Sequence, residues 1–164
     1  MDRVKGKVAV VTGAALGIGK ATAELLAREG AFVAVTDVLD GPGEELARTI
    51  GDRAHFWHLD VSKEEEMQKV LAEVAARWGK IDIMVNNAGI APANVASKTE
   101  RSVANAMKRM QGDLASIEPM NNLVDMTDAD WDRMIRVHLY GAFHGTRAAL
   151  RHMTPRRSGS IVNI

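Results

Sequence analysis

The residues with the clearest chemistry are three glycines in a turn near the N-terminus. The segment Thr12-Gly13-Ala14-Ala15-Leu16-Gly17-Ile18-Gly19 follows a short apolar run and precedes an amphipathic stretch. Between a strand and a helix, such glycines permit a tight turn, close approach of a pyrophosphate to the backbone, and close helix–strand packing. The helix N-terminus then offers free N–H groups and a favourable dipole to phosphates. We therefore predict a dinucleotide site here, against the alternative of a chance glycine-rich turn.

An acidic residue follows at the distance that this interpretation requires. Asp37 ends the second apolar run, close to the ~20-residue spacing at which a carboxylate accepts the adenosine ribose hydroxyls. At ~4 Å and an effective dielectric constant of ~20, each repulsion between Asp37 and a 2′-phosphate charge would cost about 4 kcal/mol. No Lys or Arg occupies Leu16 or Val38 to offset it. NAD is therefore favoured over NADP, and the alternative is a solvated aspartate at a strand end.

The elements that must position these residues alternate along the chain. Short apolar runs predict strands at 7–12, 31–36, 54–59, 81–85 and 160–164. Amphipathic stretches predict helices from the glycine turn to about residue 29, at 44–50 after a turn at 41–43, from a capping box at 62–65 to residue 79, and from a cap at 127–130. This alternation predicts an α/β fold with a doubly wound, parallel, Rossmann-like sheet, truncated after the fifth strand.

One segment interrupts the alternation. Residues 91–122 are too many for an ordinary strand–helix loop, and Val103, Met107, Met110, Leu114 and Ile117 follow a helical stripe. We predict an inserted helix within one domain, 1–164. The segment would leave the sheet where ligands bind in such folds, so its basic residues could form a lid over an acidic substrate tail. The alternative is a solvated helix with a buried Met/Val stripe.

Composition excludes several classes of function. The 164 residues are 46% hydrophobic and 26% charged, as in a globular domain of ordinary size. Twenty-one basic and 21 acidic residues cancel, and aromatic residues make up 4%, which argues against nucleic-acid and acidic-membrane partners. The absence of cysteine excludes thiolate metal sites, and the histidines show no metal-ligand spacing. With no signal peptide or membrane-spanning run, we expect a cytoplasmic protein.

Taken together, the motifs resemble those of the short-chain dehydrogenase/reductase family. The chain has the glycine motif at Thr12–Gly19, the Asp-Val pair at 60–61 and Asn-Asn-Ala-Gly at 86–89. Residues 137–143 resemble part of the family's fourth main helix, and 159–164 its fifth strand. The resemblance implies NAD-dependent interconversion of small-molecule alcohols and ketones. It also implies a homotetramer or homodimer for the full-length parent protein.

The resemblance also implies roles for individual residues. Leu16, Ile18 and Val38 would join the glycines and Asp37 in the cofactor site. Asp60 and Val61 would contact the adenine, Asn87, Ala88 and Gly89 would line the cleft, and Ile90 and Val137 would lie near the ribose or nicotinamide. His138 stands where the family usually has an asparagine that helps to hold a water in a proton relay. His138 could relay protons itself, or it could be a hydrogen-bonded core residue.

The catalytic Ser and Tyr-x-x-x-Lys of the family have no counterpart in these residues. Tyr140 is the single tyrosine, and His144 stands four residues later instead of lysine. We therefore expect the cofactor-binding part of a longer dehydrogenase, inactive alone. The alternatives are a non-catalytic or regulatory NAD-binding module and a remnant that neither folds stably nor binds. The substrate, whether a simple alcohol, a sugar, a steroid or a 3-oxoacyl thioester, stays open.

Overall fold

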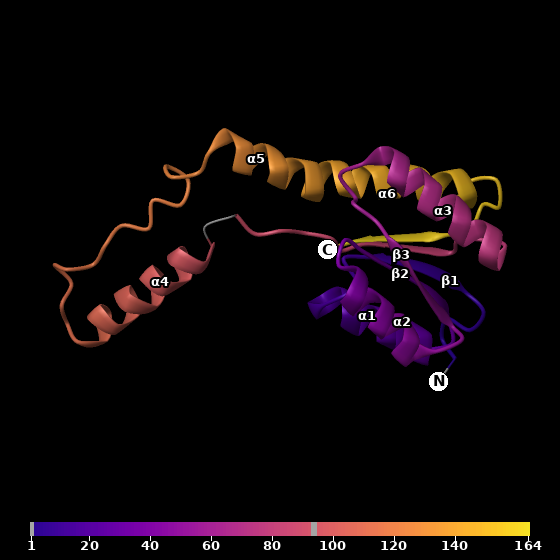
Figure 1. The fold of residues 1–164 in the computed structure, drawn as a ribbon, viewed down its shortest axis with the longest axis horizontal. Coiled ribbons are helices and arrows are strands. Elements are labelled where there is room, and N and C mark those ends of the chain that lie inside the picture. Colours follow the sequence, from indigo (N-terminus) through magenta and orange to yellow (C-terminus); the bar gives the residue numbers. More distant parts are fainter. Residues whose placement is uncertain (1, 93–94) are drawn as a thin grey trace. The chain divides into compact units, whose positions relative to one another are not determined.

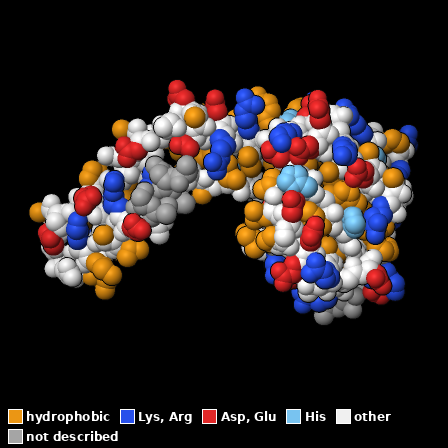
Figure 2. Space-filling view, in the orientation of Figure 1, with side chains coloured by type: hydrophobic (Ala, Val, Ile, Leu, Met, Phe, Trp, Pro, Cys, Tyr) orange, Lys and Arg blue, Asp and Glu red, His pale blue; other side chains and the backbone are white. Residues whose placement is uncertain are grey.

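The computed structural model describes residues 2–92 and 95–164. It comprises two compact units: unit 1 consists of Met1–Gly89 and Arg136–Ile164, and unit 2 of Ile90–Ile135. Residues 93 and 94 of the predicted insertion lie outside the described residues. Within the described ranges, no helix is long and apolar enough to cross a membrane. Acidic and basic side chains are interspersed over the face shown in Figure 2.

Unit 1 is built on a five-stranded parallel sheet, which confirms the predicted Rossmann-like α/β fold (Figure 1). The strands are β1 (Val8–Thr12), β2 (Phe32–Asp37), β3 (Ala54–His58), β4 (Ile83–Asn86) and β5 (Ser160–Asn163). Their order in the sheet is β3-β2-β1-β4-β5. The chain therefore runs from β1 outward to one edge and returns to build the other side from β4.

Helices cover both faces of this sheet, as apolar runs buried on both sides require (Figure 1). Helices α1 (Gly17–Arg28) and α2 (Asp40–Ile50) cover one face, and α3 (Glu64–Trp78) and α6 (Gly141–Met153) cover the other. Successive strand residues point to opposite faces. Val33 and Val35 thus join the core under α1 and α2, whereas Ala34 joins the core under α3 and α6.

Two predicted helix starts are wrong. The predicted turn at 41–43 lies inside α2, because proline is tolerated in the first turn of a helix. Ser62 does not cap α3: the helix begins at Glu64, and the Ser62 N–H and hydroxyl both donate to Asp60 Oδ1. Ser62 thus binds the Asp60 carboxylate instead of forming the capping box that the spacing of Ser62 and Glu65 predicted.

The predicted cap at residue 127 is confirmed. The Thr127 hydroxyl accepts the Asp130 N–H at 3.1 Å, at the start of α5 (Asp128–Ile135). The predicted long helix is not uniform, because η1 (Arg136–Tyr140) is a π-helical turn that precedes α6. Single π-helical turns occur frequently at functional sites.

Unit 2 holds α4 (Val95–Met110), which lies within the segment 91–122 where the sequence predicted an inserted helix. Asn105 is buried, and its amide donates to Glu118 O at 2.7 Å and accepts the Glu118 N–H at 3.1 Å. Lys108 also donates to Ser116 O, so the segment after the helix covers its polar side. The Met/Val stripe of the alternative interpretation is not buried, because Val103, Met107 and Met110 are exposed.

Candidate functional site

The site predicted from the sequence lies at the carboxyl ends of β1 and β4. These strands are neighbours at the centre of the sheet, where the strand order reverses direction. In doubly wound sheets, ligands bind in the crevice outside the strand ends at this point. Gly13 follows β1 directly, and Asn87, Ala88 and Gly89 follow β4. The fold therefore brings together two motifs that are far apart in the sequence.

A hydroxyl and an amide hold the two turns against each other. The Thr12 hydroxyl donates to Val85 O at 3.3 Å and accepts the N–H groups of Asn87 and Ala88 at 3.0 and 3.1 Å. The Asn87 side-chain amide donates to the carbonyls of Thr12 and Gly13 at 2.9 and 3.0 Å. Asn87 thus shapes the glycine turn. Sequence reasoning did not single out Thr12, although its place between the strand and Gly13 was a usable signal.

The glycines of the turn are required by space and by backbone conformation. A Cβ on Gly19 would lie 2.1 Å from Gly13 O, and one on Gly13 would lie 2.8 Å from Ala88 Cα. Gly13 and Gly17 have φ angles of +62° and +56°, which L-residues with side chains rarely adopt. The start of α1 therefore sits directly against the turn, as a phosphate-binding helix N-terminus requires.

Asp37 is fixed beside this turn at the end of β2. Its Oδ2 accepts the Ala15 N–H at 2.9 Å, and its Oδ1 accepts the Leu39 N–H at 3.1 Å. A carboxylate oxygen can accept more than one hydrogen bond, so both oxygens retain capacity for ribose hydroxyls. The apolar side chains of Leu16, Ile18 and Val38 are 58%, 64% and 51% exposed. The predicted cofactor residues of this region thus form an open surface with an oriented acceptor at its side.

Asp60 and Val61 lie after β3, where the sequence predicted the adenine contacts. Burial raises the pKa of Asp60, but hydrogen bonds from Ser62 and the nearby Lys63 ammonium outweigh it and lower the pKa overall. Val61 is buried, and its carbonyl oxygen lies 3.1 Å from His144 Nδ1. A Cβ on Gly141 would come within 2.7 Å of Val61 Cγ2. This close approach fixes the loop after β3 against α6.

A small cavity of about 100 Å³ lies where the ends of β1, β4 and β5 meet η1 and α6. Thr12, Asn86, His138 and Asn163 contribute polar groups to its lining. His138 is exposed, and a Cβ on Gly89 would lie 2.8 Å from His138 Cε1. The fold thus places an accessible imidazole beside the turn after β4.

The last predicted cofactor residues differ in their surroundings. Val137, on η1, is half-buried against the core under α3 and α6. Ile90 is the first residue of unit 2, so its part in the site stays a prediction.

Tyr140 and His144 do not form a catalytic pair. His144 is buried and faces the Val61 carbonyl, whereas Tyr140 is half-exposed. The centroids of the Tyr140 and His144 rings are 6.0 Å apart. No group of three or more His, Cys, Asp or Glu side chains that could hold a metal occurs among the residues that the structure describes.

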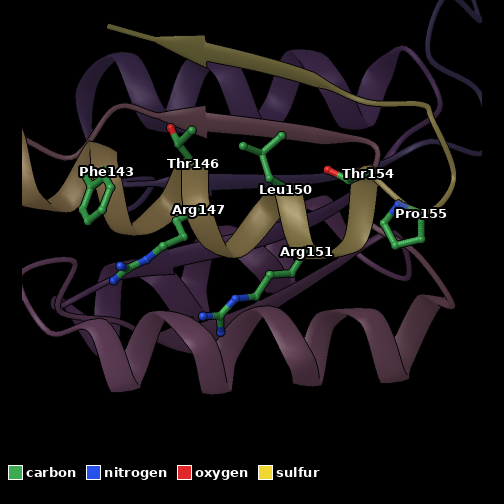
Figure 3. Close-up of a pocket in the computed structure, with 7 residues that line it drawn as sticks. All are labelled: Phe143, Thr146, Arg147, Leu150, Arg151, Thr154 and Pro155. Atoms are coloured by element: carbon green, nitrogen blue, oxygen red, sulfur yellow. The ribbon is translucent and has the colours of Figure 1, made fainter.

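A larger hollow of about 620 Å³ lies along α6 and the turn after it (Figure 3). Its lining residues are Phe143, Thr146, Arg147, Leu150, Arg151, Thr154 and Pro155. Arg147 stacks over the Phe143 ring at 4.4 Å and pairs with Glu64 of α3. The lining includes no carboxylate or imidazole for proton transfer, so this hollow is not the candidate active site.

Comparison with known proteins agrees with this geometry. A family model described as short chain dehydrogenase matches residues 7–113 and 113–164. "Tropinone reductase-like 2" of Erythroxylum coca is 38% identical over 160 residues, which are 98% of this chain and 50% of the relative. "Borneol dehydrogenase, mitochondrial" of Lavandula x intermedia is 36% identical over 163 residues, 99% of this chain and 52% of the relative.

"Secoisolariciresinol dehydrogenase" of Forsythia intermedia is 33% identical over 162 residues, 98% of this chain and 50% of that protein. The chain belongs to the short-chain dehydrogenase family. It spans about half the length of the curated relatives it matches.

Proposed function

We propose that this chain binds NAD(H) and forms the cofactor half of a dehydrogenase that interconverts a small-molecule alcohol and its ketone. The observation that carries the proposal is the joined pair of turns beside Asp37. Gly13 and Gly19 leave no room for side chains, and Asn87 locks their turn to the end of β4. Bound NAD would accept or donate the hydride, which protein side chains cannot do.

Each part of the site then has a role toward the cofactor. The N–H groups at the start of α1 bind the pyrophosphate, because glycine at 13, 17 and 19 lets it approach the backbone. The Asp37 carboxylate, held by Ala15 and Leu39 N–H groups, accepts the ribose hydroxyls. A 2′-phosphate would meet this negative charge, so NAD is preferred to NADP.

His138 is the group in these residues that we assign to proton movement. It is exposed, lines the cavity at the strand ends and lies against Gly89. An imidazole can accept a proton at one ring nitrogen and donate one from the other, so it can pass a proton between substrate and solvent. His138→Asn, which introduces the residue usual in the family, keeps a hydrogen-bonding group but removes the ring nitrogens that can exchange a proton. The expected result for the complete enzyme is activity with a changed kcat.

The second candidate is an NAD-binding module without turnover. It is favoured by the surroundings of Tyr140, the single tyrosine in the sequence, because the residue four positions later is the buried His144 instead of the lysine of the family's catalytic motif. Both candidates require NADH binding, and turnover of alcohols or ketones separates them. The relatives named for borneol and tropinone support starting the substrate screen with cyclic alcohols and ketones.

The test is a titration of the chain with NADH, followed by nicotinamide fluorescence and by the melting temperature. Binding to the native state alone stabilises by about 2.7 kcal/mol at a ligand concentration of 100 Kd. Asp37→Asn is expected to weaken NADH binding tenfold or more, at about 1.4 kcal/mol per factor of ten. Asp52→Asn is the matched control, because Asp52 precedes β3 at the opposite end of the sheet. Absence of NADH binding by the folded wild-type chain would refute the proposal.

A further inference from the structure

A second carboxylate lies near Asp37 and has no role in the site described so far. Asp37 on β2 and His58 on β3 are register partners in the parallel sheet, so their side chains lie on the same face. His58 Nδ1 is 2.7 Å from Asp40 Oδ1, and Asp40 is the first residue of α2. His58 thus contacts Asp40 and is the cross-strand neighbour of Asp37, at the carboxyl ends of the strands.

We propose that Asp40, held in place by His58, is a second determinant of cofactor choice that disfavours the 2′-phosphate of NADP. The inference rests on the proposed function, because it assumes that Asp37 receives the adenosine ribose. It concerns different residues from those that hold the cofactor. Asp37 competes for the 2′ position directly, whereas Asp40 sets the charge of the helix end beside it.

The start of α2 would otherwise suit a phosphate. Helix N-termini attract anions through their dipole and their unpaired N–H groups. Two features of α2 oppose this attraction. Asp40 places a negative charge in the first turn, and Pro42 has no N–H to donate. The sequence of this turn, Asp40-Gly41-Pro42-Gly43, includes no cation that could bind a phosphate.

The carboxylates of Asp37 and Asp40 outnumber the uncompensated basic side chains named at this edge of the sheet. Asp37 of β2 is the register partner of His58, and Asp40 of α2 contacts its ring. At the start of α3, Lys63 is paired with Glu66 at 2.8 Å and lies 3.7 Å from Asp60, so its charge is compensated there. Asp40 and His58 are 61% and 51% exposed, which means that salt screens their effect. The expected contribution is therefore modest.

The experiment compares NADH and NADPH affinities of the wild-type chain, Asp40→Asn and the control Asp52→Asn, by nicotinamide fluorescence with NADPH also as competitor. Asp40→Asn is expected to strengthen NADPH binding about three- to tenfold and to leave NADH binding within about twofold. His58→Gln, which frees Asp40, is expected to give a smaller gain of the same sign. A merely structural role for Asp40 would change both affinities together and would not depend on salt.

Salt separates the outcomes further. In about 0.5 M NaCl, the difference between wild type and Asp40→Asn is expected to shrink, because exposed charges are screened. An unchanged ratio of NADPH to NADH affinity in Asp40→Asn, with NADH bound normally, overturns this inference alone. A folded wild-type chain that binds no NADH overturns the proposed function and this inference with it. Circular dichroism of each variant confirms that the protein compared is folded.

Discussion

Replacement of Thr12 by valine is the sharpest test of how the two turns of the site are held together. Valine has nearly the same shape and suits a strand, so the change removes a hydroxyl and little else. That hydroxyl donates to Val85 O and accepts the N–H groups of Asn87 and Ala88. In Thr12→Val, both N–H groups lose their acceptor at a half-buried position.

The magnitude follows from the number of groups left without a partner. Each unsatisfied buried N–H costs about 1–3 kcal/mol, and the gain in apolar character offsets a part of the total. We expect Thr12→Val to lower the free energy of unfolding by about 2–4 kcal/mol. NADH affinity should fall as well, because the turn after β1 loses its connection to the turn after β4.

Thr36→Val is a matched control in the same sheet. Thr36 is the register partner of Thr12 on β2 and is fully buried, but its hydroxyl makes one bond, donated to Val11 O at 3.0 Å. No N–H depends on it for an acceptor among the described hydrogen bonds. The expected loss is therefore about 0.5–1.5 kcal/mol.

Urea unfolding followed by circular dichroism measures both values under the same conditions. Equal losses in Thr12→Val and Thr36→Val would refute the reasoning, since the two threonines differ in the number of partners and not in residue type. A normal NADH affinity in Thr12→Val would separately refute the link between this hydroxyl and the shape of the site.

Three further predictions concern other contacts. Gly145→Ala should lower the free energy of unfolding by about 2 kcal/mol or more, because its Cβ would lie 2.1 Å from Asn86 Oδ1, whereas Gly41→Ala, with open space around it, should be neutral or stabilising in the same urea assay. Burial raises the pKa of Asp82, but hydrogen bonds from a lysine, a backbone N–H and an arginine lower the pKa overall. The ionised carboxylate therefore contributes its full stabilisation above the unfolded value of 3.8, and this stabilisation is lost as pH falls through the lower folded pKa. Melting temperatures of Asp82→Asn should depend less on pH in acid than those of wild type. Asn105→Ala should increase hydrogen exchange within unit 2 and leave that of the sheet unchanged, because its amide holds the following segment against α4; a change confined to unit 1 would contradict this.

The sequence alone was sufficient for the fold class and for the place of the glycine turn after the first strand. Parallel strands buried on both faces appear as continuous apolar runs, and the glycine turn follows the first of them, so both can be read locally. Asp37 was predicted as a ribose-binding residue because of its spacing from the glycine turn, and the structure places it at the end of β2. Helix starts were predicted less accurately. The Ser62 hydroxyl donates to Asp60 instead of capping α3, and Pro42 lies within the first turn of α2 instead of in a turn before it.

The tertiary structure decided which residues cooperate. Thr12 and Asn87 are distant in sequence, and their hydrogen bonds exist because β1 and β4 are adjacent strands. The pairing of Asp40 with His58 depends in the same way on the register between β2 and β3. A sequence pattern records which residues could be buried or charged, but contacts between distant segments depend on strand order and register, which arise only when the whole sheet packs.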